Sequence, residues 1–466
     1  MFSQLGNNTL VQLAGKIAAT LIGLAVAVFM TRGLGPTGFG HYTTVIVFLQ
    51  TFAILTDFGL TMMAGRALGA KQIPSDVLLS NLLSFRTVTS AIVFSLAPLA
   101  ALVFPYPAIV KVGVALTSLA FFLASLTQSF QAVFQATLKS GYMVMADFWG
   151  RIVLLVGTIV AARMGWGVIA YLIVYTIASL VITVGTLFYA NKLMPFKWQI
   201  DLKVWRLIWL TTWPVALTIA LNLIYLKADT LILAVYWPAH AVGLYGAAYK
   251  VLEVLLAVPA IIGGLVLPLA ARYLALNDQQ KLRQLFQDSF DAMFGLGLAI
   301  VVGGTLVGGS ILIALAGVEF AISGQLLFPL SIATAFIFLG NVTGYFIFAL
   351  GKQKQMIPLY ALLAILSLVI YFTLIPRYAY WAAAWGHTFI EGLMSIGSLW
   401  LLGRWGFKPT PGRWPKIVLA TGLLALGLLI PMPIILRTIA AVVIYVIAIW
   451  YLKLIPTVTA KQLIHN

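Results

Sequence analysis

Ten ionisable side chains interrupt the long apolar stretches of this 466-residue chain. An ionised side chain at the centre of hydrocarbon costs at least about 2.5–3.5 kcal/mol unless it is paired or hydrated. Residues at such positions therefore need a partner, which can be a neighbouring charge, an ion or a bound molecule. The ten divide equally by sign, into the cations Lys16, Arg86, Arg151, Lys227 and Lys250 and the acids Asp57, Asp147, Asp229, Glu253 and Glu391.

Two couples among these residues have the spacing of neighbours on one helix face. Asp147 and Arg151 stand four residues apart, and Lys250 and Glu253 stand three apart. Side chains at these separations meet on a helix surface. Each couple could therefore neutralise itself, or it could serve a ligand.

Depth and direction rank the other charged residues. With a rise of 1.5 Å per residue, Arg151, Lys227 and Glu391 lie about 16–18 Å from the outer ends of their spans, near the bilayer midplane. Lys227 and Asp229 are two residues apart and point about 200° apart on a helix, so they need different partners. We expect this doublet to line an interface or cavity. Arg86 lies close enough to the end of its span for its side chain to reach the lipid headgroups.

Composition defines the environment of these charges. Hydrophobic residues make up 62% of the chain and charged residues 8%, too few to cover a surface that faces water. Apolar stretches of about 20 residues, enough to cross the bilayer as a helix, recur from end to end. We therefore predict an all-α polytopic membrane protein. The fourteen expected spans are 8–31, 42–65, 78–104, 109–136, 142–162, 166–189, 208–236, 243–271, 290–316, 322–350, 355–375, 380–402, 415–431 and 434–455.

The basic residues that give the chain its net charge of +17 lie mostly on one predicted side of the membrane. With a cytoplasmic N-terminus, eighteen Lys and Arg fall on the cytoplasmic side and five on the other, and the remaining five lie inside spans. The positive-inside rule then predicts a multi-pass protein of the cell (inner or plasma) membrane with both termini cytoplasmic. No nucleic-acid partner is expected, because the basic residues serve as anchors to anionic lipid.

A pattern of four residues occurs twice, about two hundred residues apart. The first copy is Pro36, Gly40, Tyr42 and Arg66, and the second is Pro238, Gly243, Tyr245 and Arg272. Six spans precede the basic segment 190–206 and six follow it, so the two halves would have the same orientation. We predict an N-terminal lobe at 1–200, a C-terminal lobe at 201–403 and two additional helices at 404–466. Transporters commonly bind substrate between such repeats.

Signatures of catalysis and of metal binding are missing from the sequence. There are no cysteines, and the four histidines stand without HExxH or another ligand spacing. No GxxxxGK[ST] loop is present, so the chain does not encode an ATP-driven pump. We predict no catalytic residues, no metal site and no cofactor, with H⁺ or Na⁺ as an optional coupling ion.

The segment RGLGPTGFGHY, followed by an aromatic-rich span that ends in DFGL and by Arg66, resembles the polysaccharide-exporting flippases of the multidrug/oligosaccharidyl-lipid/polysaccharide superfamily. The likeness weakens to an echo, LKADTLIL and GLYGAAYKVLE, in spans 7 and 8. It implies a V-shaped pair of six-helix lobes around a central cavity. Such proteins are not enzymes. They move polyprenyl-diphosphate-linked oligosaccharides from the cytoplasmic to the outer leaflet by alternating access, driven by an ion gradient.

The resemblance also implies which residues form the site. In such proteins spans 1, 2, 7 and 8 line the cavity. The cations would bind diphosphate through charge-assisted hydrogen bonds, and the acids would hold those cations or take up the coupling ion. The implied partners are the lipid-linked oligosaccharide, membrane lipids and other polysaccharide-assembly proteins. The substrate-binding candidates are Lys16, Arg66, Arg151, Lys227 and Lys250, and the coupling or organising acids are Asp57, Asp229 and Glu253.

Three other interpretations compete with this one. A multidrug antiporter of the same superfamily would need an acid-dominated cavity, whereas the charges inside the spans are balanced. A membrane glycosyltransferase or polymerase that uses polyprenyl carriers usually has acidic residues in a sizeable outer loop, and here Glu319 is the only acid on that side. A scaffold without transport activity leaves the charges inside the spans unexplained.

We predict that Lys227→Ala or Asp57→Ala abolishes surface polysaccharide while the protein remains inserted and folded. Each change removes a charge that the sequence places in the cavity. The measurement is surface polysaccharide at matched protein levels, and normal export from both variants would contradict the site assignment.

Overall fold

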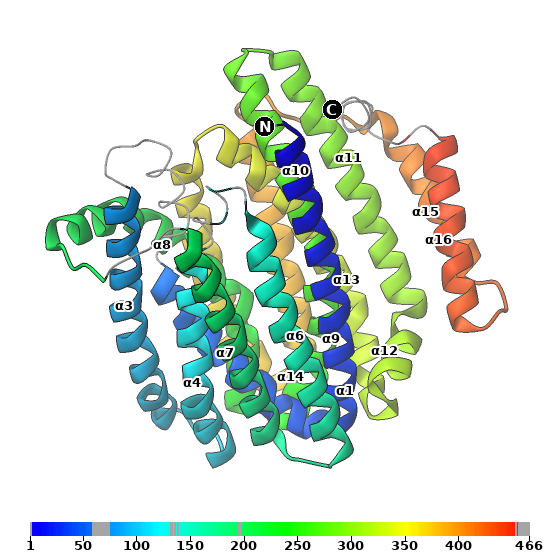
Figure 1. Ribbon diagram of the computed structural model, residues 1–466. Helices are drawn as coiled ribbons and strands as arrows, with labels where there is room; N and C mark the ends of the chain where they lie inside the picture. The colour runs from blue at the N-terminus through cyan, green and yellow to red at the C-terminus, as the bar shows by residue number, and fades with distance from the viewer. Residues whose placement is uncertain are drawn as a thin grey trace. The chain divides into compact units, whose positions relative to one another are not determined.

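The computed structural model describes residues 2–57, 75–130, 139–193 and 198–452, together with Phe134, Thr137 and Leu454. Every regular element in these residues is a helix, which confirms the predicted fold class (Figure 1). The α-helices are α1 (Phe2–Asp57), α3 (Ser75–Val103), α4 (Ala108–Ser129), α6 (Ser140–Arg163), α7 (Val168–Leu193), α8 (Leu202–Tyr236), α9 (Ala239–Leu255), α10 (Ala257–Ala275), α11 (Gln279–Gly303), α12 (Gly309–Ala316), α13 (Ala321–Ala349), α14 (Ile357–Gly403), α15 (Trp414–Leu428) and α16 (Ile434–Tyr451).

The helices group into two compact units, Met1–Gly246 and Ala247–Asn466. Within the described residues, eleven helical segments are long and apolar enough to cross a membrane. Large apolar side chains such as Leu96, Leu99 and Leu102 are more than half exposed on the outer face of α3. An apolar surface of this kind is suited to lipid rather than to water, so the chain is a multi-pass membrane protein.

Two helices each hold two of the predicted spans. α1 changes direction at Gly35 (φ 61°) and α14 at Ala379 (φ 51°), and the residues on either side of each break are helical. The sequence predicted a turn of about ten residues between spans 1 and 2, but the structure turns at a single residue. Gly35 supplies the positive φ without a Cβ penalty, and Pro36 then begins the second arm with its fixed φ.

Close packing shows the direction of the helices in the first unit. The first arm of α1 runs parallel to α6, because Gly15 packs on Val144 and Gly33 packs on Ala162. α6 and α7 are joined by a short connection and run antiparallel, so α7 is also antiparallel to the first arm of α1. This arrangement places the charged middle of α6 beside the first arm of α1.

Hydroxyl pairs join equivalent helices in the two units. Thr127 and Thr183 link α4 to α7 with an Oγ to Oγ distance of 3.0 Å, across 56 residues of chain. Thr343 and Ser398 link α13 to the second arm of α14 at 2.7 Å, across 55 residues. Both units therefore contain a helix that packs against the helix two spans further along the chain, as a parallel duplication would produce.

The two glycines of the repeated pattern pack on each other within the first unit. A methyl group on Gly40 would overlap the carbonyl oxygen of Ala239, and one on Gly243 would overlap the carbonyl oxygen of Pro36. Both glycines lie inside helices. Gly40 is therefore the contact where two backbones touch, whereas Gly35 of the same Gly and Pro cluster forms the turn.

A further glycine-rich segment, Gly303–Gly309, contains a single turn of π-helix at Gly304–Gly308. A methyl group on Gly304 would overlap the Ser331 side chain, and one on Gly308 would approach the Leu327 side chain to 2.9 Å. These glycines allow close packing against α13.

We predict that Gly40→Ala or Gly243→Ala destabilises the protein by about 1–3 kcal/mol, because the new methyl group forces two backbones apart. Gly264→Ala in α10 is the matched control, since nothing lies within 4 Å of a Cβ there. Thermal unfolding in detergent measures the effect. Equal unfolding temperatures for Gly40→Ala and Gly264→Ala would contradict this packing.

Candidate functional site

The predicted couple on α6 forms an ion pair. Arg151 Nε donates to Asp147 Oδ2 at 2.7 Å, and each side chain is 36% exposed. Arg151 Nη1 also donates to the backbone carbonyl of Ala19 on α1 at 3.3 Å. The couple therefore neutralises itself, as its spacing indicated, and in addition it ties α6 to α1.

This ion pair opens onto a groove between α1 and α6. The groove has a volume of about 400 Å³, which is within the range of small-molecule sites. Its α1 wall consists of alanine and glycine, so the space between the helices remains open. An apolar trench with one guanidinium on its wall can hold an anionic group beside an apolar chain. The lining residues are Ala14, Gly15, Ala18, Ala19, Gly141, Val144, Met145, Asp147, Phe148 and Arg151.

Lys16 is on α1 but does not line this groove. It is exposed, and it lies about 200° around the helix from both Ala14 and Ala18. The structure thus brings Arg151 and Asp147 to the groove and leaves Lys16 on another face of α1.

Asp229 is fully buried and held by three donors. Its Oδ1 accepts from the Thr230 amide at 2.5 Å and from Thr230 Oγ1 at 3.1 Å, and its Oδ2 accepts from Tyr245 Oη at 2.6 Å. Lys227 is only half-buried, so the two members of the doublet have different surroundings, as predicted. Sequence reasoning did not identify Tyr245 as a partner of Asp229, although Tyr245 is one of the four residues of the repeated pattern.

The second predicted couple is also an ion pair. Lys250 Nζ lies 2.8 Å from Glu253 Oε2 on α9, and both residues belong to the second unit. Asp57 is the last residue of α1, and its side chain lies outside the described part of the structure. Arg66 lies outside the described residues altogether.

Arg86 corrects one expectation. Its side chain is 1% exposed, so it is packed inside the first unit and does not reach the headgroups. The reason is its position on α3, where residues 81–86 are all buried. Glu391 is likewise buried within the second unit. It lies about one helical turn after His387, which is also buried.

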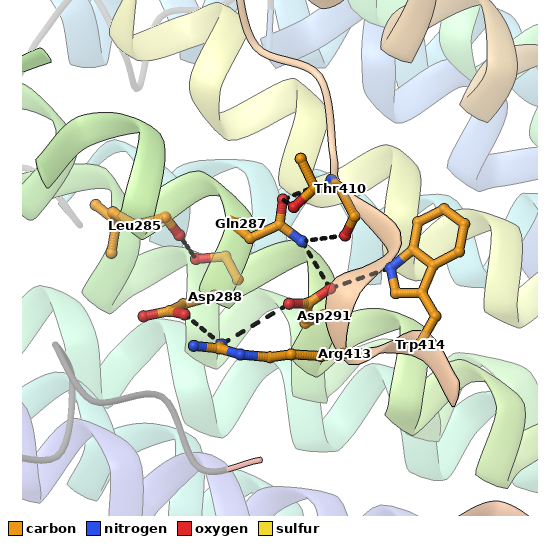
Figure 2. Close-up of polar contacts among 8 residues, drawn as sticks. Leu285, Gln287, Asp288, Asp291, Thr410, Arg413 and Trp414 are labelled. Atoms are coloured by element: carbon orange, nitrogen blue, oxygen red, sulfur yellow. Dashed lines mark hydrogen bonds and ion pairs between the residues drawn. The ribbon is translucent and has the colours of Figure 1, made fainter. Parts of the chain in front are cut away.

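A polar cluster on the middle of α11 was also missed (Figure 2). It contains Asp288, Asp291 and Arg413, and the acids are separated from the cation by more than 120 residues of chain. Asp291 is only the second residue of a predicted span, and Arg413 had been counted among the cytoplasmic anchors. The spacing of the two acids, three residues apart on one helix, was the available signal.

The family described as polysaccharide biosynthesis protein matches residues 5–274, which is more than half of the chain. The chain belongs to the polysaccharide biosynthesis protein family. This membership confirms the resemblance in the first two spans, and the match contains every residue that lines the groove between α1 and α6.

Solved structures share the fold of this family member. The lipid II flippase MurJ, in an inward closed conformation, aligns with a TM-score of 0.80 and 13% identity over 95% of this chain and 100% of its own. An inward-facing multidrug resistance MATE transporter of the MOP superfamily aligns at 0.66 and 13% identity, over 86% of this chain and 98% of that one. An outward-facing MATE transporter aligns at 0.61 and 14%, over 87% and 95%. A comparison with curated proteins found no match.

We predict that Asp147→Asn and Arg151→Gln each lower the unfolding temperature, and that the double variant recovers most of the loss. A single change leaves one charge without its partner inside a membrane span. The coupling free energy should be about 0.5–1 kcal/mol, between that of a surface pair and that of a buried pair.

The matched control is the pair of Asp278 and Lys281, in which Nζ lies 2.9 Å from Oδ2. This pair lies outside the apolar part of α11 and should show no measurable coupling. Equal coupling in the two pairs would mean that the membrane does not strengthen the pair on α6.

Proposed function

We propose that this protein moves a polyprenyl-diphosphate-linked oligosaccharide from the cytoplasmic to the outer leaflet of the cell membrane by alternating access. The observation that carries the proposal is the family match over residues 5–274. The fold supports it, because the flippase MurJ and both inward-facing and outward-facing MATE transporters share this fold.

The groove between α1 and α6 provides chemistry that fits a diphosphate. A guanidinium has five N–H donors in a planar fork that matches phosphate oxygens. Arg151 uses two of its nitrogen atoms for Asp147 and Ala19, which fixes the plane of the guanidinium while part of it remains exposed. The site is thus preorganised for an anion before substrate arrives.

Asp147 tunes the strength of this site. Its carboxylate already compensates the charge of Arg151, so a phosphate would compete with an existing ion pair 2.7 Å long. A carrier must release its substrate on the far side of the membrane, and a fully unpaired cation in an apolar groove would hold a diphosphate too tightly.

We propose that the apolar groove wall contacts the lipid close to the diphosphate, while the rest of the prenyl chain stays in the bilayer.

The other candidates have roles that follow from their surroundings. We propose that Asp229 organises the contact between α8 and α9, because Tyr245 and Thr230 already donate to its carboxylate. Asp57 and Glu253 are then the candidates for a coupling H⁺ or Na⁺. Lys16, Arg66, Lys227 and Lys250 remain proposed contacts for the anionic headgroup, with both termini in the cytoplasm and other polysaccharide-assembly proteins as partners.

An antiporter of organic cations is the second candidate, because MATE transporters share the fold at TM-scores of 0.66 and 0.61. The groove lacks the acid-dominated lining that an organic cation needs, because Asp147 and Arg151 balance each other on its wall.

Deletion of the gene tests the proposal. We expect lipid-linked sugar intermediates to accumulate, because the flipping step that consumes them is lost, and we expect the full-length chain to restore their normal level. Mass spectrometry of extracted membrane lipids measures this accumulation. Sensitivity to cationic drugs without accumulation of these lipids would contradict the proposal and support the antiporter.

A further inference from the structure

The two arms of α14 lie against each other. A methyl group on Gly386 would lie 2.9 Å from the Tyr371 side chain, and one on Gly397 would lie 2.9 Å from the Leu359 side chain. In each contact the two residues are about equally far along the chain from the break at Ala379. The arms are therefore antiparallel and pack together, and the chain turns back at Ala379.

This turn lies at the surface of the membrane. α14 has 47 residues, so each arm is long enough to cross the hydrocarbon core. Tyr378, Tyr380 and Trp381 stand on either side of Ala379, and Tyr and Trp are the side chains enriched at membrane–water interfaces. This end of α14 is therefore at the level of the lipid headgroups.

A groove of about 480 Å³ begins at the turn and runs between the two arms. Its lining extends from Tyr378 and Trp381, beside the turn, to Ile370 and Phe389. With a rise of 1.5 Å per residue, it reaches about 12 Å from the turn towards the hydrocarbon. None of its lining residues is charged. The groove therefore suits an apolar chain that enters from the level of the headgroups.

Small residues keep the groove open, and large aromatic residues form its rim. Ala382 and Gly386 line it, are buried and stand one helical turn apart, so they form its floor. Trp385 and Phe389 also line it but are 46% and 53% exposed. Trp385 packs edge-on against Phe328 of α13, with ring centroids 5.8 Å apart. This contact holds the rim in place, so the groove is preformed.

A cation stands at the end of the groove beside the turn. Arg377 is exposed and directly precedes Tyr378. It follows Ile370 by seven residues and Leu374 by three, which places it on the helix face that both residues present to the groove. Within the part of the chain that the structure describes, Arg377 forms no ion pair. A guanidinium at headgroup level attracts a phosphate.

We propose that this groove binds one anionic phospholipid, with an acyl chain between the arms of α14 and the phosphate on Arg377. A zwitterionic phospholipid has the same chains but brings a second positive charge close to Arg377. A soluble anion would pair with Arg377 but leave the apolar groove unfilled. All the lining residues belong to α14, so this lipid site is distinct from the groove between α1 and α6 and does not depend on the transported substrate.

Native mass spectrometry of the full-length protein tests the headgroup contact. The protein is titrated with phosphatidylglycerol, which is anionic, and with phosphatidylcholine, which is zwitterionic, both with the same chains. We expect the first phosphatidylglycerol to bind more tightly, and Arg377→Gln to weaken it about fivefold, the effect of one cation near an anionic lipid. Phosphatidylcholine should bind to this variant as it does to the wild type.

The control for this contact is Arg163→Gln. Arg163 is also exposed and ends a span, α6, but it does not line the groove. It should bind both lipids as the wild type does. If Arg163→Gln weakens phosphatidylglycerol as much as Arg377→Gln does, the preference reflects general surface charge and the proposal is wrong.

Leu374→Trp tests the contact with the acyl chain, because a larger side chain at this partly exposed position fills the groove. We expect it to weaken both lipids alike, since both have the same chains. Leu362→Trp, at a position that is 60% exposed on the same arm outside the groove, is the control and should change neither. Unchanged binding of both lipids to Leu374→Trp would overturn the proposal. Binding of a polyprenyl phosphate but not of phosphatidylglycerol would also overturn it, because the occupant would then be a prenyl lipid.

Discussion

The cost of an unpaired charge in hydrocarbon is the constraint on which this structure depends. Three of the described carboxylates inside the spans meet it in different ways: Asp147 through Arg151, Glu253 through Lys250, and Asp229 through the hydroxyl of Tyr245. Two of these solutions also join structural elements. The pair on α6 reaches the backbone of α1, and the carboxylate of Asp229 holds α8 against α9.

Local features of this arrangement could be predicted from the sequence. The all-α class follows from composition, and the pair of Asp147 and Arg151 follows from a spacing of four residues because a helix brings these positions together. Partners that are distant in the chain could not be predicted. Spacing on α11 does not indicate that Arg413 packs on Asp288 across 125 residues, and a depth estimate does not show that α3 buries Arg86 inside protein.

Duplication explains a second group of features. The repeated glycines Gly40 and Gly243 lie backbone against backbone, and equivalent hydroxyl pairs join helices in the two units. The sequence pattern singled out both glycines as members of a repeat, and the Gly and Pro cluster that contains Gly40 does form a turn, at Gly35. Only the packing shows that a contact between helices needs them. The same fold occurs in a lipid II flippase and in multidrug transporters, so the fold alone does not indicate the substrate.

The central claim is that the groove carrying Arg151 and Asp147 serves the movement of an anionic lipid-linked sugar. The most direct test uses purified protein in liposomes that contain a fluorescent polyprenyl-diphosphate oligosaccharide, with a membrane-impermeant reagent that quenches the outer leaflet. The account predicts that the protein moves the lipid between leaflets, and that a double variant Asp147→Asn, Arg151→Gln moves it much more slowly although it is folded. Movement of an organic cation by the wild-type protein in the same liposomes, with the lipid-linked sugar left in its original leaflet, would contradict it.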